Sequence, residues 1–178
     1  MPDESPETFA IPQTLSDNGF TFRPEREEDV PFLSFLFYTT RAEETERAAD
    51  WPLEQRQAFL HSQFELQRKH YYGHFPYCNY LVLEHMGAPI GRLYLDMAPK
   101  SLDVLDISLL PQWRGRGIGG AIMDGVLARA RASGRYVGLY VERFNPAFRL
   151  YERLGFKEVA DTGLYIEMHW KPEENPTA

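Results

Sequence analysis

The sequence predicts a mixed α/β fold in which helices cross between the strands of a single sheet. Some segments carry apolar residues at the three- and four-residue spacing of a helix that buries one face. Other segments alternate between apolar and polar residues, or are apolar throughout, as strands are. The two kinds of segment follow one another along the chain, separated by glycine and proline, and this order is typical of helices packed on a sheet.

The N-terminal part predicts one strand, two helices and a loop. Residues 20–23 (FTFR) alternate and predict a short strand. The segment 25–44 predicts a helix with one apolar face, and Pro52 suits the first turn of a second helix. The stretch HYYGHFPYCNY at 70–80 is dense in aromatic residues but is interrupted by glycine and proline, so we expect a loop there.

The rest of the chain predicts strands separated by two helices. One helix spans 118–132, with Ile122, Val126 and Ala130 on one face, and the other spans 145–154. The expected strands are a pair within 80–97 joined by a turn at 86–89, then 101–110, 136–141, 156–160 and 164–170.

The length of 178 residues favours one domain with a sizeable core. We expect this domain to span residues 16–171. The start of the chain is acidic and contains several prolines and serines, so residues 1–15 predict a flexible tail. Residues 172–178 (PEENPTA) predict a second tail at the C-terminus.

The composition argues against several classes of protein. A net charge of −7 without any block of lysine and arginine argues against a nucleic-acid partner. No apolar run reaches the roughly 18 residues of a membrane span, and the N-terminus lacks the regions of a secretory signal. The single cysteine, Cys78, excludes an internal disulfide framework and favours a reducing compartment. We therefore expect a cytoplasmic protein with neither a nucleic-acid nor a membrane partner.

The stretch QWRGRGIGGAIM at 112–123 places four glycines and two arginines between a predicted strand and a predicted helix. The free N–H groups and the positive dipole of a helix N-terminus attract anions. Glycines let the backbone approach a phosphate closely, and Arg114 and Arg116 can add charge-assisted hydrogen bonds. The stretch therefore predicts a phosphate-binding loop.

Two well-known phosphate motifs fit this loop less well. The Walker pattern is absent because no Gly-Lys-Ser/Thr follows. Gly115, Gly117 and Gly120 match the G-x-G-x-x-G spacing of Rossmann domains, and Glu142 follows after a predicted strand. That fingerprint belongs to the first strand of its sheet, whereas here most of the domain precedes it. A dinucleotide-binding domain is kept as a remote alternative.

A second stretch, NPAFRLYERLGF at 145–156, predicts a short capped helix packed on the sheet. Asn145 is a good N-cap, and Pro146 suits the first helical position. Gly155 ends the helix, and Phe156 begins the next strand.

Together the two stretches resemble the GCN5-related N-acetyltransferase (GNAT) superfamily. The acetyl-CoA signature of that family, Arg/Gln-x-x-Gly-x-Gly/Ala, is matched by Arg114, Gly117 and Gly119, and an overlapping copy starts at Gln112. The later family motif is matched at Asn145, Leu150, Tyr151, Leu154, Gly155 and Phe156. The resemblance is specific over about 102–156, and the first predicted strand and helix are loosely similar to those of the family.

The resemblance implies a GNAT-like central mixed, largely antiparallel sheet, splayed at the acetyl-CoA site, with helices on both faces. It implies acetyl-CoA as co-substrate, held by backbone N–H groups, with the N–H of Leu109 toward the acetyl carbonyl. The positions implied to bind it are Leu109, Leu110, Pro111, Arg114, Gly115, Arg116, Gly117, Ile118, Gly119, Gly120 and Asn145.

The activity implied by the resemblance is direct transfer of an acetyl group from acetyl-CoA to a primary amine. Tyr151 is the implied general acid for the departing thiolate. Asp103, six residues before Leu109, is the implied general base because several family members carry a glutamate there. The alternatives for the base are Asp106, Glu142, Glu84 and water.

The sequence leaves the acceptor and the class of function open. The amine belongs either to a small molecule or to a peptide, and the aromatic residues of 71–80 or the acids Glu43, Glu44 and Glu46 could line its site. The histidines show no metal-ligand spacing, so we expect no metal. A non-catalytic acyl-CoA-binding sensor or docking module on the same fold is the alternative to an enzyme, as a monomer or a homodimer.

Overall fold

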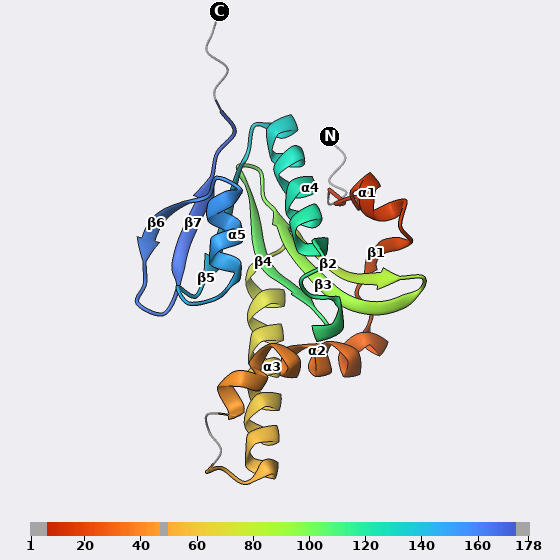
Figure 1. Cartoon of the computed structure of the whole chain (residues 1–178), viewed down its shortest axis with the longest axis vertical. Coiled ribbons are helices and arrows are strands. Elements are labelled where there is room, and N and C mark those ends of the chain that lie inside the picture. Colours follow the sequence, from red (N-terminus) through yellow and green to blue (C-terminus); the bar gives the residue numbers. More distant parts are fainter. Residues whose placement is uncertain (1–6, 47–49, 174–178) are drawn as a thin grey trace, which may run out of the picture.

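A seven-stranded sheet in the order β1-β2-β3-β4-β5-β7-β6 organises the chain in the computed structural model, which describes residues 7–46 and 50–173 (Figure 1). Neighbouring strands are antiparallel except β4 and β5, which are parallel and are connected through α4. The strands are β1 (Phe20–Pro24), β2 (Cys78–His85), β3 (Ala88–Met97), β4 (Ser101–Leu109), β5 (Tyr136–Val141), β6 (Lys157–Asp161) and β7 (Ile166–Trp170). This arrangement confirms the predicted mixed α/β fold.

The helices pack around this sheet in two groups (Figure 1). They are α1 (Gln13–Ser16), α2 (Val30–Glu46), α3 (Leu53–His74), α4 (Ile118–Ser133) and α5 (Ala147–Arg153), with short 3-10 turns η1 (Glu27–Asp29) and η2 (Pro111–Trp113). Buried residues of α4 and α5 share one core with β4, β5 and β7. A second, smaller core of Leu33, Phe37 and Phe64 joins α2 to α3.

The predicted loop at 70–80 is confirmed only over 75–77 and is wrong on either side, because α3 continues to His74 and β2 already begins at Cys78. The glycine and proline suggested an irregular segment, but two tyrosines anchor the end of the helix. Tyr71 donates a hydrogen bond to the Leu105 carbonyl, and Tyr72 donates to Glu25. Gly73 makes the helical conformation of this segment less favourable, but these tertiary contacts offset that cost.

The flexible tail predicted for residues 1–15 is contradicted over its described part. Phe9 and Leu15 are buried in the main core, and Glu7 pairs with Arg129 and Arg135. Apolar side chains in this acidic segment therefore find a site against the body of the domain. Residues 1–6, at the start of the predicted tail, and 174–178, in the predicted C-terminal tail, lie outside the described residues.

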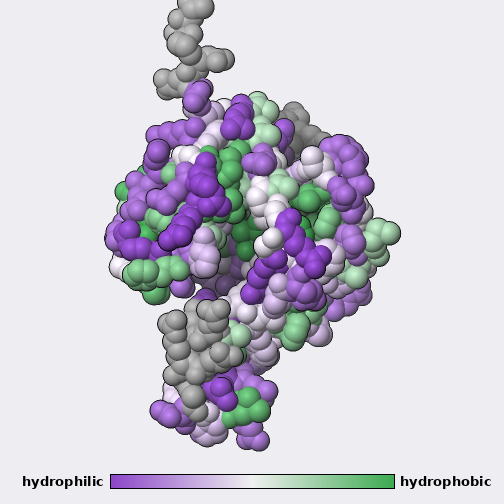
Figure 2. Space-filling model, viewed as in Figure 1, coloured by the Kyte–Doolittle hydropathy of each residue, from purple (hydrophilic) through white to green (hydrophobic). Residues whose placement is uncertain are grey.

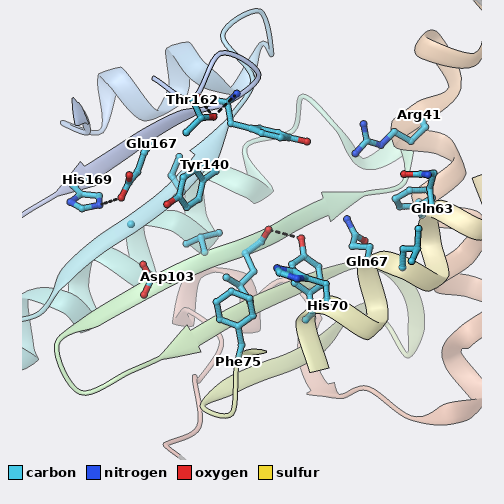
Figure 3. A pocket seen from close by; sticks show the side chains of 18 of the residues that line it. Arg41, Gln63, Gln67, His70, Phe75, Asp103, Tyr140, Thr162, Glu167 and His169 are labelled. Atoms are coloured by element: carbon cyan, nitrogen blue, oxygen red, sulfur yellow. Dashed lines mark hydrogen bonds and ion pairs between the residues drawn. The ribbon is translucent and has the colours of Figure 1, made fainter. Parts of the chain in front are cut away.

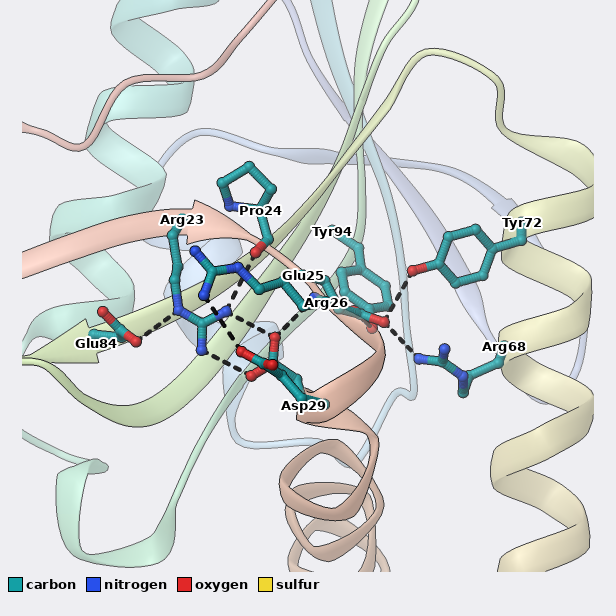
Figure 4. Close-up of polar contacts among 10 residues, drawn as sticks. Arg23, Pro24, Glu25, Arg26, Asp29, Arg68, Tyr72, Glu84 and Tyr94 are labelled. Carbon is teal, nitrogen blue, oxygen red and sulfur yellow. Dashed lines mark hydrogen bonds and ion pairs between the residues drawn. The ribbon is translucent and has the colours of Figure 1, made fainter.

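Two buried carboxylates hold the start of the chain to the sheet and to α3 (Figure 4). Arg23 on β1 donates to both oxygens of Asp29, and these bonds hold the pKa of Asp29 below its usual range. Glu25, whose side chain is only 2% exposed, accepts hydrogen bonds from Arg68 and Tyr72 of α3 and from Tyr94 of β3. These contacts fix the position of α3 relative to the sheet.

Strands β4 and β5 pair only over part of their length. Their last paired residues are Val104 and Leu139, and beyond this point β4 continues to Leu109 paired with β3 but not with β5. A β-bulge lies at the same place: Leu95 pairs with Val104 and Tyr94 with Asp106, so Leu105 is the extra residue. The two strands thus diverge where the bulge redirects β4, and the sheet is splayed as predicted.

Within the described residues, no helix is long and apolar enough to cross a membrane. In the view of Figure 2, hydrophilic and hydrophobic residues are mixed over the body of the molecule.

Candidate active site

A cavity of about 850 Å³ lies between α2, α3 and one face of strands β4, β5 and β7 (Figure 3). Its lining comes from five parts of the chain that are distant in sequence. The lining residues are Phe37, Arg41, Gln63, Leu66, Gln67, His70, Tyr71, Phe75, Asp103, Val104, Leu105, Tyr136, Gly138, Leu139, Tyr140, Thr162, Tyr165, Glu167 and His169. The cavity includes Val104, Leu105 and Leu139, so it reaches the point where β4 leaves β5.

The end of this cavity over β5 and β7 is aromatic and acidic. Glu167 lies 2.8 Å from the Nε2 atom of His169, and the His169 ring stacks on Tyr136 at 4.8 Å. Figure 3 shows Asp103, Tyr140, Glu167 and His169 gathered at this end, whereas Gln63 and Gln67 project from α3 at the other.

Asp103 lies directly beside the divergence of the two strands, opposite Gly138 of β5. A Cβ atom on residue 138 would lie 2.5 Å from Asp103 Oδ1, so glycine leaves room for the carboxylate. Ser101 donates a hydrogen bond to the other carboxylate oxygen. Burial raises the pKa of Asp103, and the charge of Glu167 acts in the same direction, while Ser101 and His169 oppose the shift.

The three other carboxylates considered as general base do not line this cavity. Asp106 is held by the buried Arg92 at 2.8 Å, and Glu84 by Arg23 at 2.7 Å. Glu142 lies 3.9 Å from Arg41. Of the four carboxylates predicted from sequence, Asp103 alone faces the cavity.

The free end of β4 offers backbone groups to the gap between the strands. The N–H of Leu110 donates to the Ile90 carbonyl at 2.8 Å, so Gly91 and Leu109 form a non-hydrogen-bonded pair of the antiparallel ladder. The N–H and carbonyl of Leu109 therefore point away from β3. Because the pattern alternates, those of Ile107 point the same way. Leu110 and Pro111 offer no N–H group to the gap, because the N–H of Leu110 faces β3 and proline has none.

The glycine-rich loop leads from this strand end, through η2, into α4. Gly115 and Gly117 have φ values of +70° and +79°, which glycine adopts without strain. Ala121 donates to the Gly117 carbonyl at 3.0 Å, so the N–H groups of Ile118, Gly119 and Gly120 precede the first intrahelical bond. No side chain caps this helix terminus. The terminus thus has the features of an anion site.

The fold itself does not require glycine at 119 and 120. Both residues are helical, and a Cβ atom on either would have no neighbour within 4 Å. Glycine in a helix costs up to about 1 kcal/mol relative to alanine. The two glycines leave open space in front of the helix terminus at this energetic cost. Such a space suits a phosphate group that contacts the backbone.

Three polar residues predicted to bind acetyl-CoA lie around this terminus or beside the next helix. Arg114 donates to the Leu109 carbonyl at 2.9 Å and to Thr39 of α2 at 3.1 Å. Arg116 lies over the Trp113 ring at 5.0 Å. Asn145 is exposed, and its Oδ1 accepts the N–H of Ala147 at 2.9 Å, as expected for a residue that caps α5.

Tyr151 projects from α5 into the main core and is 7% exposed. Its ring contacts Phe156, with 5.7 Å between the centroids. Burial raises the pKa of Tyr151 to about 12, and the charge of Asp106 on β4 adds to this shift. The phenol therefore keeps its proton and is near enough to β4 to respond to a charge on that strand.

Sequence reasoning missed several cavity residues. Tyr136, Tyr140, Glu167 and His169 lie on strands at alternating positions, so they project from one face. The signal in the sequence was the two-residue alternation of polar and aromatic residues along these strands, which places them on one open face. Of the aromatic residues of 71–80, Tyr71 and Phe75 line the cavity. The side chains of Glu43, Glu44 and Glu46 lie outside the described residues. Among the described residues, no cluster of three or more His, Cys, Asp or Glu could hold a metal.

Residues 76–158 match the family model of the acetyltransferase (GNAT) domain. No curated protein matches the chain. The matched segment contains β4, the glycine-rich loop, α4 and α5, which are the elements that carried the resemblance in the sequence. The resemblance to GNAT acetyltransferases is thus confirmed by the match of this segment.

Solved structures of acetyltransferases have the same fold. The PaiA N-acetyltransferase from Thermoplasma acidophilum, in complex with coenzyme A, is 18% identical with a TM-score of 0.63, covering 85% of this chain and 98% of its own. YncA from Salmonella typhimurium, with its cofactor acetyl-CoA, is 20% identical with a TM-score of 0.52, and the match covers 90% of this chain and 98% of YncA. Histone acetyltransferase HPA2 and related acetyltransferase from Corynebacterium glutamicum is 22% identical with a TM-score of 0.61, covering 90% and 99%.

The raised pKa of Asp103 predicts a pH-dependent stability difference between the wild type and Asp103→Asn. The folded protein keeps the Asp103 proton to higher pH than the unfolded chain does. The free energy of unfolding of the wild type therefore falls as pH rises from the unfolded to the folded pKa. Asparagine does not titrate, so the variant should gain stability relative to the wild type over this interval. Urea denaturation from about pH 4 to about pH 8 measures the difference. A difference that does not change with pH would show that burial does not act on this carboxylate.

Proposed function

We propose that this protein is an acetyl-CoA-dependent N-acetyltransferase that transfers the acetyl group directly to a primary amine. The observation that carries the proposal is the divergence of β4 from β5 beside both a glycine-rich helix terminus and an acid-lined cavity. One side of the divergence suits a phosphate-bearing donor, and the other suits a cationic acceptor. The match of residues 76–158 to the GNAT acetyltransferase family model supports the same reaction class.

Acetyl-CoA would supply a thioester, an acetyl donor with a stable thiolate as leaving group. The N–H groups from Gly115 to Gly120 would hold its pyrophosphate at the N-terminus of α4, whereas the N–H of Arg114 already donates to the Pro111 carbonyl at 3.2 Å. The N–H groups of Leu109 and Ile107, which face the gap, would donate to the acetyl carbonyl oxygen. A donor placed there stabilises the negative charge that develops on this oxygen when the amine attacks.

Asp103 would accept the proton that the acceptor ammonium must lose before its nitrogen can attack. Its position beside the divergence and in the cavity supports this role, and so does its pKa, which burial raises toward neutral. The amine nitrogen then forms a bond to the acetyl carbon. The carbon–sulfur bond breaks, and the electron pair leaves with the sulfur.

Tyr151 would donate a proton to the departing thiolate. A phenol whose pKa is raised to about 12 holds its proton at neutral pH. It can therefore act as an acid without first being protonated from solution. The proton that Asp103 gains and the proton that Tyr151 loses return to equilibrium with water after the products leave.

The cavity walls beside Asp103 favour an acceptor that carries an aromatic or a second cationic group close to the reacting amine. Asp103 and Glu167 lie at one end of the cavity and would repel a carboxylate on the acceptor. Tyr136, Tyr140 and Tyr165 offer ring faces and edges to a flat group or to an ammonium.

The proposed function is tested by thiol release from acetyl-CoA across primary amines that differ only in one substituent close to the amine: phenyl, ammonium or carboxylate. We expect turnover to be fastest with the phenyl and ammonium compounds. Asp103→Asn should lower this turnover by about 10²–10⁴-fold, the usual contribution of a general base, with acetyl-CoA affinity preserved. Acetyl-CoA binding without turnover on any amine would contradict an enzyme and support a non-catalytic acyl-CoA-binding module.

Gly119→Leu should weaken acetyl-CoA binding by at least about 10-fold, since a side chain would occupy the space between phosphate and backbone. The fold should tolerate the change, because a Cβ atom there meets nothing within 4 Å. Gly73→Leu on α3 is the matched control: its Cβ position is equally open, yet it lies far from the loop in sequence. Calorimetry gives the affinities. Equal affinity in both variants would exclude this terminus as the phosphate site.

Tyr151→Phe should lower kcat by about 10- to 10³-fold and leave acetyl-CoA affinity nearly unchanged, because only the transition state needs the proton. The ring that contacts Phe156 is retained, so packing should persist. Steady-state kinetics, calorimetry and thermal unfolding of the same samples separate the effects. If kcat is unchanged, Tyr151 is a core residue only.

A further inference from the structure

The bulge at Leu105 in β4 is held from outside the sheet. Leu105 is the extra residue of β4 at this point, so it has no partner on β3. The hydroxyl of Tyr71, near the end of α3, donates a hydrogen bond to the Leu105 carbonyl at 3.1 Å. A backbone carbonyl that the ladder leaves out thus receives its donor from a helix that lines the cavity.

A second contact from the same face of α3 holds the next residue of β4. Gln67 precedes Tyr71 by one helical turn, so both side chains project from one side of the helix. The Gln67 amide oxygen accepts from Arg92 at 2.8 Å, and the same Arg92 nitrogen contacts Asp106 at 2.8 Å. Arg92 is 2% exposed. The two contacts therefore hold Leu105 and Asp106, where β4 turns away from β5.

We propose that Tyr71 is a positioning residue, whose hydroxyl sets the direction in which β4 leaves β5 and so orients the N–H groups of Ile107 and Leu109. This inference rests on the proposed function, because these N–H groups are the proposed donors to the acetyl oxygen. The phenol itself needs no contact with either substrate. It acts through the bulge.

The same face of α3 contacts both the cavity proposed for the acceptor and the strand proposed to bind acetyl-CoA. Gln67 and Tyr71 line the cavity proposed for the acceptor, and they also hold the strand proposed for the donor. An acceptor that fits against this wall therefore meets a β4 strand whose direction is already fixed. Burial raises the pKa of Tyr71, so the phenol remains a hydrogen-bond donor over the working pH range.

Tyr71→Phe tests the proposal because it removes the hydroxyl and keeps the ring, which contacts Tyr94 and Phe75 edge-on. We expect kcat to fall by about 10-fold or more, since small displacements of reacting groups are costly in rate. The Kd for acetyl-CoA should stay within about twofold, because α4 holds the pyrophosphate. In the free protein, the amide NMR resonances of Ile107 and Leu109 should shift.

Tyr72→Phe is the matched control on the neighbouring residue of the same helix. Its hydroxyl donates to Glu25 at 2.9 Å instead of to the bulge carbonyl (Figure 4), and its ring stacks on Tyr80. The variant loses one hydroxyl and one hydrogen bond, as Tyr71→Phe does. We expect it to lose stability while kcat and the amide resonances of Ile107 and Leu109 stay as in the wild type.

The outcomes separate this proposal from the proposed function. If the wild type turns over and Tyr71→Phe matches it in kcat, or changes the two amides no more than Tyr72→Phe does, the positioning role is wrong. If the wild type turns over no amine, the proposed function fails, and the amide resonances alone decide whether Tyr71 sets the strand direction. A loss of kcat that only follows the folded fraction, measured by thermal unfolding, also contradicts the proposal.

Discussion

The parting of β4 from β5 is the constraint on which the rest of this structure depends. Parallel strands normally pair along their shared length, and here pairing stops at Val104 and Leu139 because the bulge at Leu105 redirects β4. The backbone groups of Ile107 and Leu109, which a continuous sheet would use, are left facing the gap. The fold thus gives up ladder hydrogen bonds and gains a row of donors that a ligand can use.

Both ends of the opened strand are stabilised by side chains from other elements. Arg114 bonds the carbonyl of Leu109 at the far end, and Tyr71 bonds the carbonyl of Leu105 at the bulge. A fully buried carbonyl without a donor costs about 1–3 kcal/mol, and the cost is smaller for the half-buried Leu105 and Leu109. These two contacts reduce that cost. Tyr71 and Arg114 bond carbonyl oxygens only, so they do not occupy the N–H groups of Ile107 and Leu109.

The position of α3 depends on buried charge. The side chains of Glu25 and Arg92 are nearly inaccessible to solvent, and each bonds to groups from more than one element, although the Nε atom of Arg92 has no hydrogen-bond partner. Removing one partner of a buried ion pair leaves an uncompensated charge and costs about 3–5 kcal/mol. These networks therefore specify a single placement of α3 against the sheet, and the shape of the cavity follows from that placement. Apolar packing through Leu33, Phe37 and Phe64 joins α2 to α3 and adds to this placement.

The sequence by itself determined the elements whose signals are local. Hydrophobic periodicity and the glycines of 115–120 located α4 and its open terminus, and Asn145 marked the start of α5, because caps and helix faces are properties of neighbouring residues. Only the tertiary structure decided the cavity. Glu167 and His169 reach Asp103 because β7 inserts between β5 and β6, and the tyrosines expected in a loop extend α3 because their partners, Glu25 and Leu105, lie far away in the chain. Local propensity cannot encode such pairs, since their energy exists only once distant segments have come together.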